Sequence, residues 1–319
     1  MTNNNSSAID SSNSQALLNQ IVIEYMREQR RKRFWRWIKR SIILLLILCG
    51  VYLFVLMRAE AVSARAKPHV GLVEIKGTIF DNQSASSDNF MKSLQKAYEN
   101  KAMKAVILRI DSPGGSPVQG DYMYNTVRYF RKKYPDIKVY AVCVDICASA
   151  AYYVASAADE IYANPSSLVG SIGVIYNGFG FVDTLQKLGV TRRLQTAGSN
   201  KGFMDQFSPV NPAQQKTLQT MLDIIHQQFI SKVKEGRGKR LHIDSETFSG
   251  LFWTGIQAKE KGLIDGLASS GQLAREIIKI DDAVDYTYKP SVMERVAKNI
   301  GTAMADQLPI ALGIKPGIQ

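Results

Sequence analysis

The chain has 319 residues, which is enough to bury the core of one large domain or two small ones without disulfide staples. Its formal net charge is +12, but eight basic residues and a single acid lie between Arg27 and Arg40. Because much of the excess is local, we expect no nucleic-acid partner. The cysteines, Cys49, Cys143 and Cys147, lack metal-ligand spacing, so we expect no metal and no cofactor. A bridge between Cys143 and Cys147 stays open.

The first 37 residues are predicted to form a cytoplasmic tail. Residues 1–15 are rich in Asn and Ser, which is typical of a disordered segment. Apolar residues then recur at helical spacing and lead into the basic cluster, which predicts a helix over about 16–33. We expect this helix to lie on the cytoplasmic membrane surface.

An uncharged apolar run predicts a membrane anchor. Residues 41–57, with Ile38 and the flanking Trp35 and Trp37, reach the roughly 17–20 residues that cross ~30 Å of hydrocarbon. We predict one transmembrane helix over 38–57, held in membrane lipid. A buried core helix is the alternative, which the aromatic and basic flank disfavours.

The charges on either side of this helix predict its orientation. Eight basic residues precede it and three follow it, so the positive-inside rule places the N-terminus in the cytoplasm and residues after 58 outside. In a Gram-negative cell the anchor lies in the inner membrane and the following domain in the periplasm. A cleavable signal peptide is the competing interpretation, although about 40 residues before the apolar core is long for a signal.

After a linker at 58–67, apolar strands alternate with helical segments. Strands are expected at 69–75, 105–110 and 138–144, and helices at about 88–100, at about 118–133 and from about 149. This alternation predicts an α/β domain with parallel strands joined by right-handed crossovers.

A second set of elements completes the domain, which we place at 68–285. Strands are expected near 160–163, 171–175 and 190–195, a long helix over about 212–233, and shorter helices near 244–249, 256–261 and 270–279. Residues 286–319 form a C-terminal tail with an amphipathic stretch from Met293 to Met304. Partner contact and a flexible extension are both open for this tail.

A glycine-containing turn follows the second buried strand. The sequence DSPGGS runs from Asp111 to Ser116, and Gly114 and Gly115 allow backbone N–H groups to approach a bound group closely. Such a turn can form an oxyanion hole. A plain turn is the alternative.

A serine lies at the next strand-to-helix junction. Ser149 stands among small residues in CASAAYY, the segment into which the strand VYAVCV leads. Such a junction exposes a hydroxyl beside free helix N-terminal amides, which suits a nucleophile. An ordinary N-cap serine is the alternative.

A serine nucleophile needs a base, and the histidines at 69, 226 and 242 are poorly placed for a Ser-His-Asp triad. A lysine can serve when burial lowers its pKa toward neutrality. Lys201 is a candidate because it lies among small and apolar residues in AGSNKGFM, whereas most other lysines lie in amphipathic helices or charged clusters.

Several motifs together resemble the signal peptide peptidase A family of serine peptidases, in its short membrane-anchored form. They are SPGG, SAAYYVASAADEIYANP, GSIGV and a Gly-x-x-Lys segment ending in Ser-Pro. The resemblance covers about residues 68–285, with the motifs in the same order and spacing. It implies the fold of the Clp protease and crotonase superfamily, an α/β core built from a repeated β-β-α spiral.

The resemblance also implies roles for particular residues. Ser149 is similar to the family's nucleophile and Lys201 to its general base, while Gly114 and Gly115, with Ala150, match the oxyanion hole. Ser171 in GSIGV matches a serine that hydrogen-bonds the lysine, with a turn serine as the alternative. No metal is implied.

Family members assemble as rings that enclose their active sites, and in the short form the serine and the lysine come from neighbouring protomers. The resemblance therefore implies a ring-shaped homo-oligomer, with an octamer as a candidate size. It also implies peptide substrates, namely signal peptides or other small unfolded polypeptides cut outside the cytoplasm.

The sequence departs from the family pattern at two places. Ala150 and Ala151 follow the nucleophile where glycines are usual, and Gly202 follows the lysine where an aspartate is common, with Asp205 nearby. Two other functions therefore stay open: a catalytically silent membrane scaffold that binds peptides, and a crotonase-like acyl-CoA enzyme. The serine and lysine pairing and the anchor count against the second.

Overall fold

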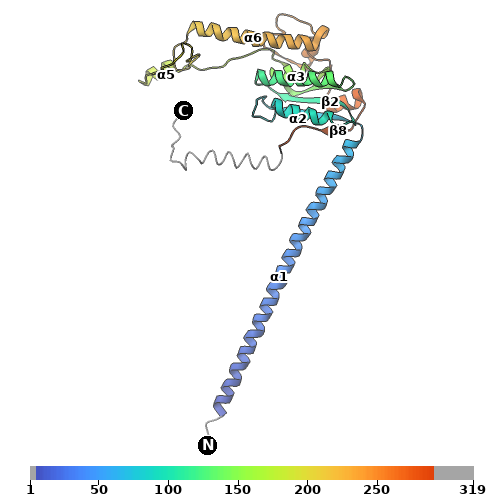
Figure 1. The fold of residues 1–319 in the computed structure, drawn as a ribbon, viewed down its shortest axis with the longest axis vertical. Coiled ribbons are helices and arrows are strands. Elements are labelled where there is room, and N and C mark those ends of the chain that lie inside the picture. Colours follow the sequence, from blue (N-terminus) through green and yellow to red (C-terminus); the bar gives the residue numbers. More distant parts are fainter. Residues whose placement is uncertain (1–4, 291–319) are drawn as a thin grey trace. The chain divides into compact units, whose positions relative to one another are not determined.

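The computed structural model describes residues 5–290, with side chains described within 23–56 and 66–290. The chain divides into two compact units, with the boundary in the sequence between Ala64 and Arg65. The first contains all but the last two residues of helix α1, Asn5–Ala66, whose segment Ile23–Leu56 is long and apolar enough to cross a membrane (Figure 1). Among the described residues this is the one such helix.

Helix α1 is longer than the sequence predicts at both ends. It runs through part of the segment expected to be disordered and through the expected linker at 58–67. No proline interrupts residues 5–66, and the first one, Pro68, stands two residues beyond the helix end. Because proline disfavours helix at the residue before it, the helix stops there.

The second unit is an α/β domain built on one mostly parallel sheet. The strands are β1 His69–Lys76, β2 Met103–Ser112, β3 Lys138–Ala148, β4 Glu160–Ala163, β5 Leu168–Gly170, β6 Phe252–Thr254, β7 Gly266–Leu267 and β8 Ala283–Asp285. They run in the order β6-β5-β3-β2-β1-β8, and β4 pairs with both β3 and β7. Every pairing is parallel except β5 with β6.

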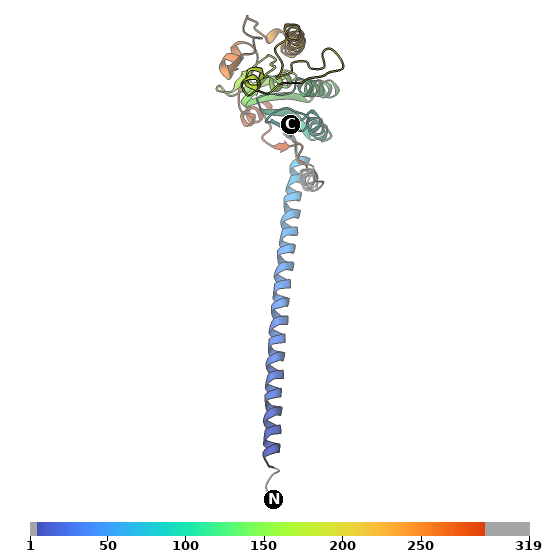
Figure 2. The same cartoon turned by 90° about the vertical axis from the view of Figure 1, so that its left-hand side faces the viewer.

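The helices connect these strands. They are α2 Ser87–Tyr98, α3 Pro117–Lys133, α4 Ala150–Ala155, α5 Val182–Lys187, α6 Pro212–Arg237, α7 Gly255–Glu260 and α8 Ser270–Gln272, with a 3₁₀ turn η1 at Gly238–Arg240 and a π-helical turn η2 at Leu273–Ile278. Figure 2 shows α2 and α3 packed side by side against the sheet. The predicted parallel α/β architecture is therefore confirmed.

The central strands are buried on both faces, as expected of a parallel sheet covered by crossovers. One face of β2, with Val106, Leu108 and Ile110, packs against α2, α3, α4 and the C-terminal part of α6. The other face, with Ala105 and Ile107, packs against η2. This alternation follows from the two-residue period of a strand.

Three short elements predicted from the sequence are absent from this described domain. Residues 171–175 and 190–195 are not strands, and residues 244–249 form turns instead of a helix. Segment 171–175 follows β5, which ends at Gly170 with a φ of +109°. Its apolar residues include Ile172, which is buried, and Ile175, which lines a cavity. These apolar residues pack in a loop or line a cavity wall and do not pair in a sheet. Their strand propensity therefore gave a wrong prediction.

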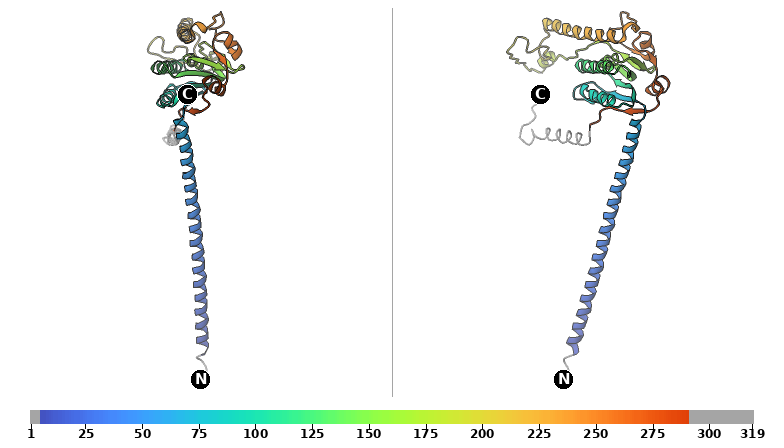
Figure 3. Two further views of the ribbon diagram at one scale, coloured as in Figure 1. Left: turned by 90° about the vertical axis from the view of Figure 1, so that its right-hand side faces the viewer. Right: turned by 45° about the vertical axis from the view of Figure 1, so that its right-hand side comes forward.

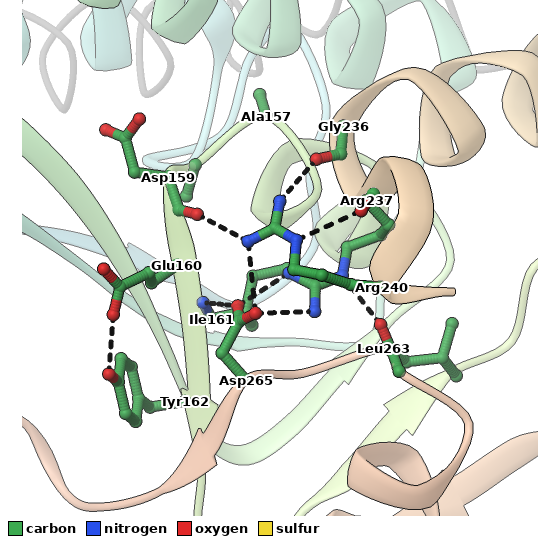
Figure 4. A network of polar contacts seen from close by, with 12 residues as sticks. Ala157, Asp159, Glu160, Ile161, Tyr162, Gly236, Arg237, Arg240, Leu263 and Asp265 are labelled. Atoms are coloured by element: carbon green, nitrogen blue, oxygen red, sulfur yellow. Dashed lines mark hydrogen bonds and ion pairs between the residues drawn. The ribbon is translucent and has the colours of Figure 1, made fainter. Parts of the chain in front are cut away.

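A buried arginine fastens the C-terminal end of α6 to the sheet. Arg237, 1% exposed, donates two hydrogen bonds to the carboxylate of Asp265, at 2.7 and 3.0 Å (Figure 4). Asp265 also accepts from Arg240 and from the amide of Ile161 in β4. Burial alone would raise the pKa of the Asp265 carboxyl, but Arg237, the Ile161 amide and Arg240 hold that pKa below its ordinary value.

We expect Asp265→Asn to lower the free energy of unfolding by about 3–5 kcal/mol, because it leaves the Arg237 charge buried without a counter-ion. Urea denaturation of the detergent-solubilised protein measures this loss. Since the carboxyl pKa is lowered in the fold, its stabilisation is complete above the unfolded value of about 3.9 and fades at lower pH, so the two proteins should converge in acid. As a matched control, Glu235→Gln removes the more exposed ion pairs with Arg128 and Lys232 and should cost less than about 1 kcal/mol. Equal losses for both variants would contradict the role of burial.

Candidate active site

Ser149 lies at a sharp turn between β3 and α4. Its φ of 54° and ψ of −127° lie outside the regions that a non-glycine residue ordinarily adopts. The turn is fixed by the Ser149 N–H, which donates to the Gly170 carbonyl at 2.8 Å, and by the Ser149 carbonyl, which accepts from the Tyr153 N–H at 2.9 Å. The side chain makes no N-cap hydrogen bond, so the predicted alternative of an ordinary capping serine does not describe it.

The glycine turn after β2 packs directly against this serine. A methyl group at Gly114, where φ is +97°, would lie 2.7 Å from the Ser149 Cβ. A methyl group at Gly115 would lie 2.3 Å from the Ile79 carbonyl oxygen. Only glycine fits at these two positions. Because Gly114 has no side chain, its backbone can lie within van der Waals distance of Ser149.

Two backbone amides beside Ser149 have no hydrogen-bond acceptor among the described residues, namely those of Gly115 and Ala150. The Gly114 amide instead donates to the Ser112 hydroxyl at 3.1 Å. Unpaired amides at a helix N-terminus and a glycine turn can donate to an anionic oxygen. Of the three predicted oxyanion-hole amides, Gly114 could take part only by giving up its present bond.

The alanines after the serine are accommodated without filling the site. A Cβ at Gly120 in α3 would lie 3.1 Å from the methyl group of Ala150, so the bare backbone of Gly120 provides room for that methyl group. Ala151 is fully buried in the core. A glycine in α3 therefore compensates for the methyl group of Ala150, and the methyl group of Ala151 belongs to the core.

A cavity of about 470 Å³ opens beside Ser149. Its walls come from α3, α4, the segment after β5, and α6. They comprise Gly115, Pro117, Val118, Asp121, Tyr122, Ser149, Ala150, Tyr153, Gly173, Val174, Ile175, Ile225, Gln228 and Phe229. Most of this surface is apolar, and such a cavity suits an apolar or long aliphatic side chain of a ligand.

Lys201 does not line this cavity. It lies in an exposed turn between α5 and α6, in the part of the chain that Figure 3 shows beyond the N-terminal end of α6. Nearby, Asp205 accepts hydrogen bonds from Ser208 and Arg192 rather than from Lys201. Within one chain the structure thus does not bring the predicted serine and lysine together.

Ser171 lies at the end of β5, next to the residue that holds the Ser149 amide. It has a φ of 51°, and its N–H donates to the Leu251 carbonyl at 2.8 Å. Its carbonyl accepts from the Gly173 N–H. These bonds describe a tight turn and fix where the following segment enters the cavity wall.

The three histidines lie within the described residues, and none of them lines the cavity. His226 contacts the Ile172 carbonyl at 3.0 Å, His69 contacts Tyr286 and the Lys67 carbonyl, and His242 contacts the Glu260 carbonyl. Each has a backbone partner. A histidine base for Ser149 is therefore unsupported in this chain, in agreement with the sequence analysis.

Comparison with known proteins identifies the family. The model of peptidase family S49 matches residues 131–284, and that of Clp protease matches residues 73–169. The "Putative protease slr0021" of Synechocystis sp. is 34% identical over 207 residues, which cover 65% of this chain and 72% of that protein. The chain belongs to peptidase family S49.

Other relatives of this S49 member vary in length and name. "Serine protease SPPA, chloroplastic" of Arabidopsis thaliana is 30% identical over 64% of this chain and 29% of its own length. "Na(+)/H(+) antiporter NhaA" of Brucella abortus is 44% identical over 57% of this chain, but the chain spans only 25% of that protein. A solved membrane-bound stomatin-specific protease in complex with a substrate peptide aligns with a TM-score of 0.41 and 19% identity, covering 74% of this chain and 99% of that one.

The S49 and Clp protease matches confirm the predicted family resemblance and the predicted fold class. The Clp protease match covers both the glycine turn and Ser149, which lie at the carboxyl ends of β2 and β3. Ligands of parallel α/β sheets commonly bind at that edge.

Two cavity residues were missed by the sequence analysis. Asp121 in α3 and Tyr153 in α4 are joined by a hydrogen bond of 2.8 Å from the tyrosine hydroxyl to the carboxylate. Burial, followed by this bond and the carboxylate charge, raises the Tyr153 pKa well above its ordinary value. A signal did exist in the sequence: an acid lies within the second turn of the helix that follows the glycine turn.

Proposed function

We propose that this S49-family protein is a serine endopeptidase whose nucleophile is Ser149. The observation that carries the proposal is the strained backbone of Ser149 beside two amides without acceptors, at the edge of an apolar cavity. Strain of this kind at a strand-to-helix turn exposes a hydroxyl to a substrate. A packing serine would need neither the strain nor the free amides.

In the proposed reaction, the Ser149 hydroxyl oxygen attacks the carbonyl carbon of a peptide bond while a base accepts its proton. The carbonyl oxygen becomes anionic and is stabilised by the N–H groups of Gly115 and Ala150. Collapse of this intermediate breaks the C–N bond, and the protonated base returns its proton to the leaving amine. Water then hydrolyses the acyl-enzyme by the same steps.

The base is proposed to be Lys201 of a neighbouring copy of the chain. Among the described residues no lysine or histidine lines the cavity beside Ser149, while Lys201 stands exposed in the segment between α5 and α6. Around this segment the chain exposes large apolar side chains, including Ile175 at 83%, Phe179 at 71% and Leu188 at 70%. Contact with a second copy would bury these apolar side chains. The same contact would place Lys201 of one copy beside Ser149 of the other.

A head-to-tail contact of this kind closes into a ring when its rotation allows. We propose such a ring, with Ser171 of the serine-bearing copy positioning the incoming lysine. The substrates are proposed to be signal peptides or other small unfolded polypeptides, which can enter an enclosed site. The anchor in α1 is proposed to leave the N-terminus in the cytoplasm and the peptidase domain outside.

Covalent labelling tests the nucleophile and the topology together. In detergent, a fluorophosphonate probe should modify Ser149, located by mass spectrometry of the tryptic peptide. On intact spheroplasts, a membrane-impermeant fluorophosphonate should also label the protein, while an N-terminal tag stays protected from added protease. Labelling elsewhere in the chain would refute the assigned nucleophile. Labelling in detergent but not on spheroplasts would refute only the orientation.

A further inference from the structure

The cavity beside Ser149 contains one carboxylate among mostly apolar walls. Asp121 projects from α3 into a space bounded by Val118, Ile225 and Phe229. One carboxylate oxygen accepts from the Tyr153 hydroxyl at 2.8 Å, and the other accepts from the Asn125 amide at 2.9 Å. The carboxylate therefore has a fixed position in the cavity wall.

The charge of Asp121 is not balanced by a cation in the described part of the chain. Its two partners are a neutral hydroxyl and a neutral amide, and no lysine, arginine or histidine there forms an ion pair with it. A carboxylate can accept about four hydrogen bonds, and these two leave room for more. An unbalanced charge beside apolar walls favours a ligand that brings the opposite charge.

The position of Asp121 relative to the nucleophile is set by α4. Tyr153 lies one helical turn after Ser149, and its N–H donates to the Ser149 carbonyl. Residues four apart lie on the same face of a helix, and Ser149, Tyr153 and Asp121 line the same cavity. A lysine or arginine side chain can lay its aliphatic carbons against such apolar walls while its charged end contacts a carboxylate.

We propose that Asp121 selects substrates with a cationic side chain, lysine or arginine, at the residue whose carbonyl Ser149 attacks. This inference rests on the proposed peptidase function and adds a substrate class to it. Val118, Ile225 and Phe229 contact the aliphatic stem, and Asp121 accepts hydrogen bonds from the charged end. Tyr153 is 4% exposed, and the hydrogen bond that its hydroxyl donates orients the carboxylate.

The test uses the full-length protein in detergent and three quenched fluorescent peptides that differ only at the cleaved residue: lysine, norleucine or glutamate. Norleucine keeps an aliphatic stem and removes the charge. We expect kcat/KM for lysine to exceed that for norleucine by about tenfold or more, with glutamate lowest. In Asp121→Asn, which can still accept from Tyr153, the lysine-to-norleucine ratio should fall to near one.

A matched control is Asp136→Asn, which removes the same charge from an exposed turn outside the cavity and should leave the ratio unchanged. If Asp121 only holds Tyr153 in place, Asp121→Asn will weaken both peptides equally, and this overturns the proposal. Cleavage of all three peptides by the parent without a lysine preference overturns it as well, while leaving the peptidase function standing.

A binding measurement separates this proposal from the proposed function. Fluorescence anisotropy with Ser149→Ala protein reports the affinity for the same peptides without turnover. Tighter binding of the lysine peptide, lost in the Ser149→Ala/Asp121→Asn double variant, supports the assigned selectivity even if the parent cuts nothing. Equal binding of lysine and norleucine peptides, together with no cleavage, overturns both proposals.

Discussion

Ser149→Ala is expected to lower kcat for peptide hydrolysis by a factor of about 10⁴ to 10⁶, the range found when a serine nucleophile is removed. The loss should be this large because an acyl-enzyme can no longer form, while the free amides of Gly115 and Ala150 remain. Binding of an uncut peptide should change little, since the cavity walls are otherwise intact. Initial rates with a quenched fluorescent peptide measure the effect.

The control for this substitution is Ser166→Ala, at an exposed turn position before β5. It removes the same hydroxyl from the same domain and should keep full activity. Both proteins must show the parent's assembly on size-exclusion chromatography. A Ser149→Ala protein of normal assembly that still hydrolyses peptides at more than about one hundredth of the parent rate would exclude Ser149 as the nucleophile.

Much of the fold could be predicted because each central element carries its own local pattern. The strands β1, β2 and β3 are rich in apolar residues, and α2, α3 and α6 have helical periodicity. The places of the glycine turn and Ser149 in the fold could also be predicted, because each follows an apolar strand in the sequence and precedes a helix. Here, local sequence and tertiary structure agree.

Other features had no local signal. Whether 171–175 becomes a strand depends on the turn at Gly170 and on packing against α6, neither of which its composition reports. Asp121 meets Tyr153 only because α3 and α4 pack together, 32 residues apart in sequence. The exposed position of Lys201 is likewise a property of the fold, since its small and apolar neighbours suggested burial.

The location of Lys201 makes the assembly part of the proposed chemistry. Co-expressed Ser149→Ala and Lys201→Ala chains, carrying different affinity tags, should form mixed assemblies with activity although each variant alone is silent. In such an assembly a site works when its serine comes from a Lys201→Ala chain and its lysine from a Ser149→Ala neighbour. With equal and random mixing, this holds at about a quarter of the sites of a ring.

Purification through both tags in sequence ensures that only mixed assemblies are assayed. Activity near a quarter of the parent's would establish that the serine and lysine act across an interface between copies. As a matched control, Lys187→Ala removes a lysine from α5, in the same exposed region, and should be fully active on its own. A confirmed mixed assembly without activity would mean that both groups must come from one chain. The segment carrying Lys201 would then have to move toward Ser149, because the described structure keeps Lys201 out of the wall of the serine's cavity.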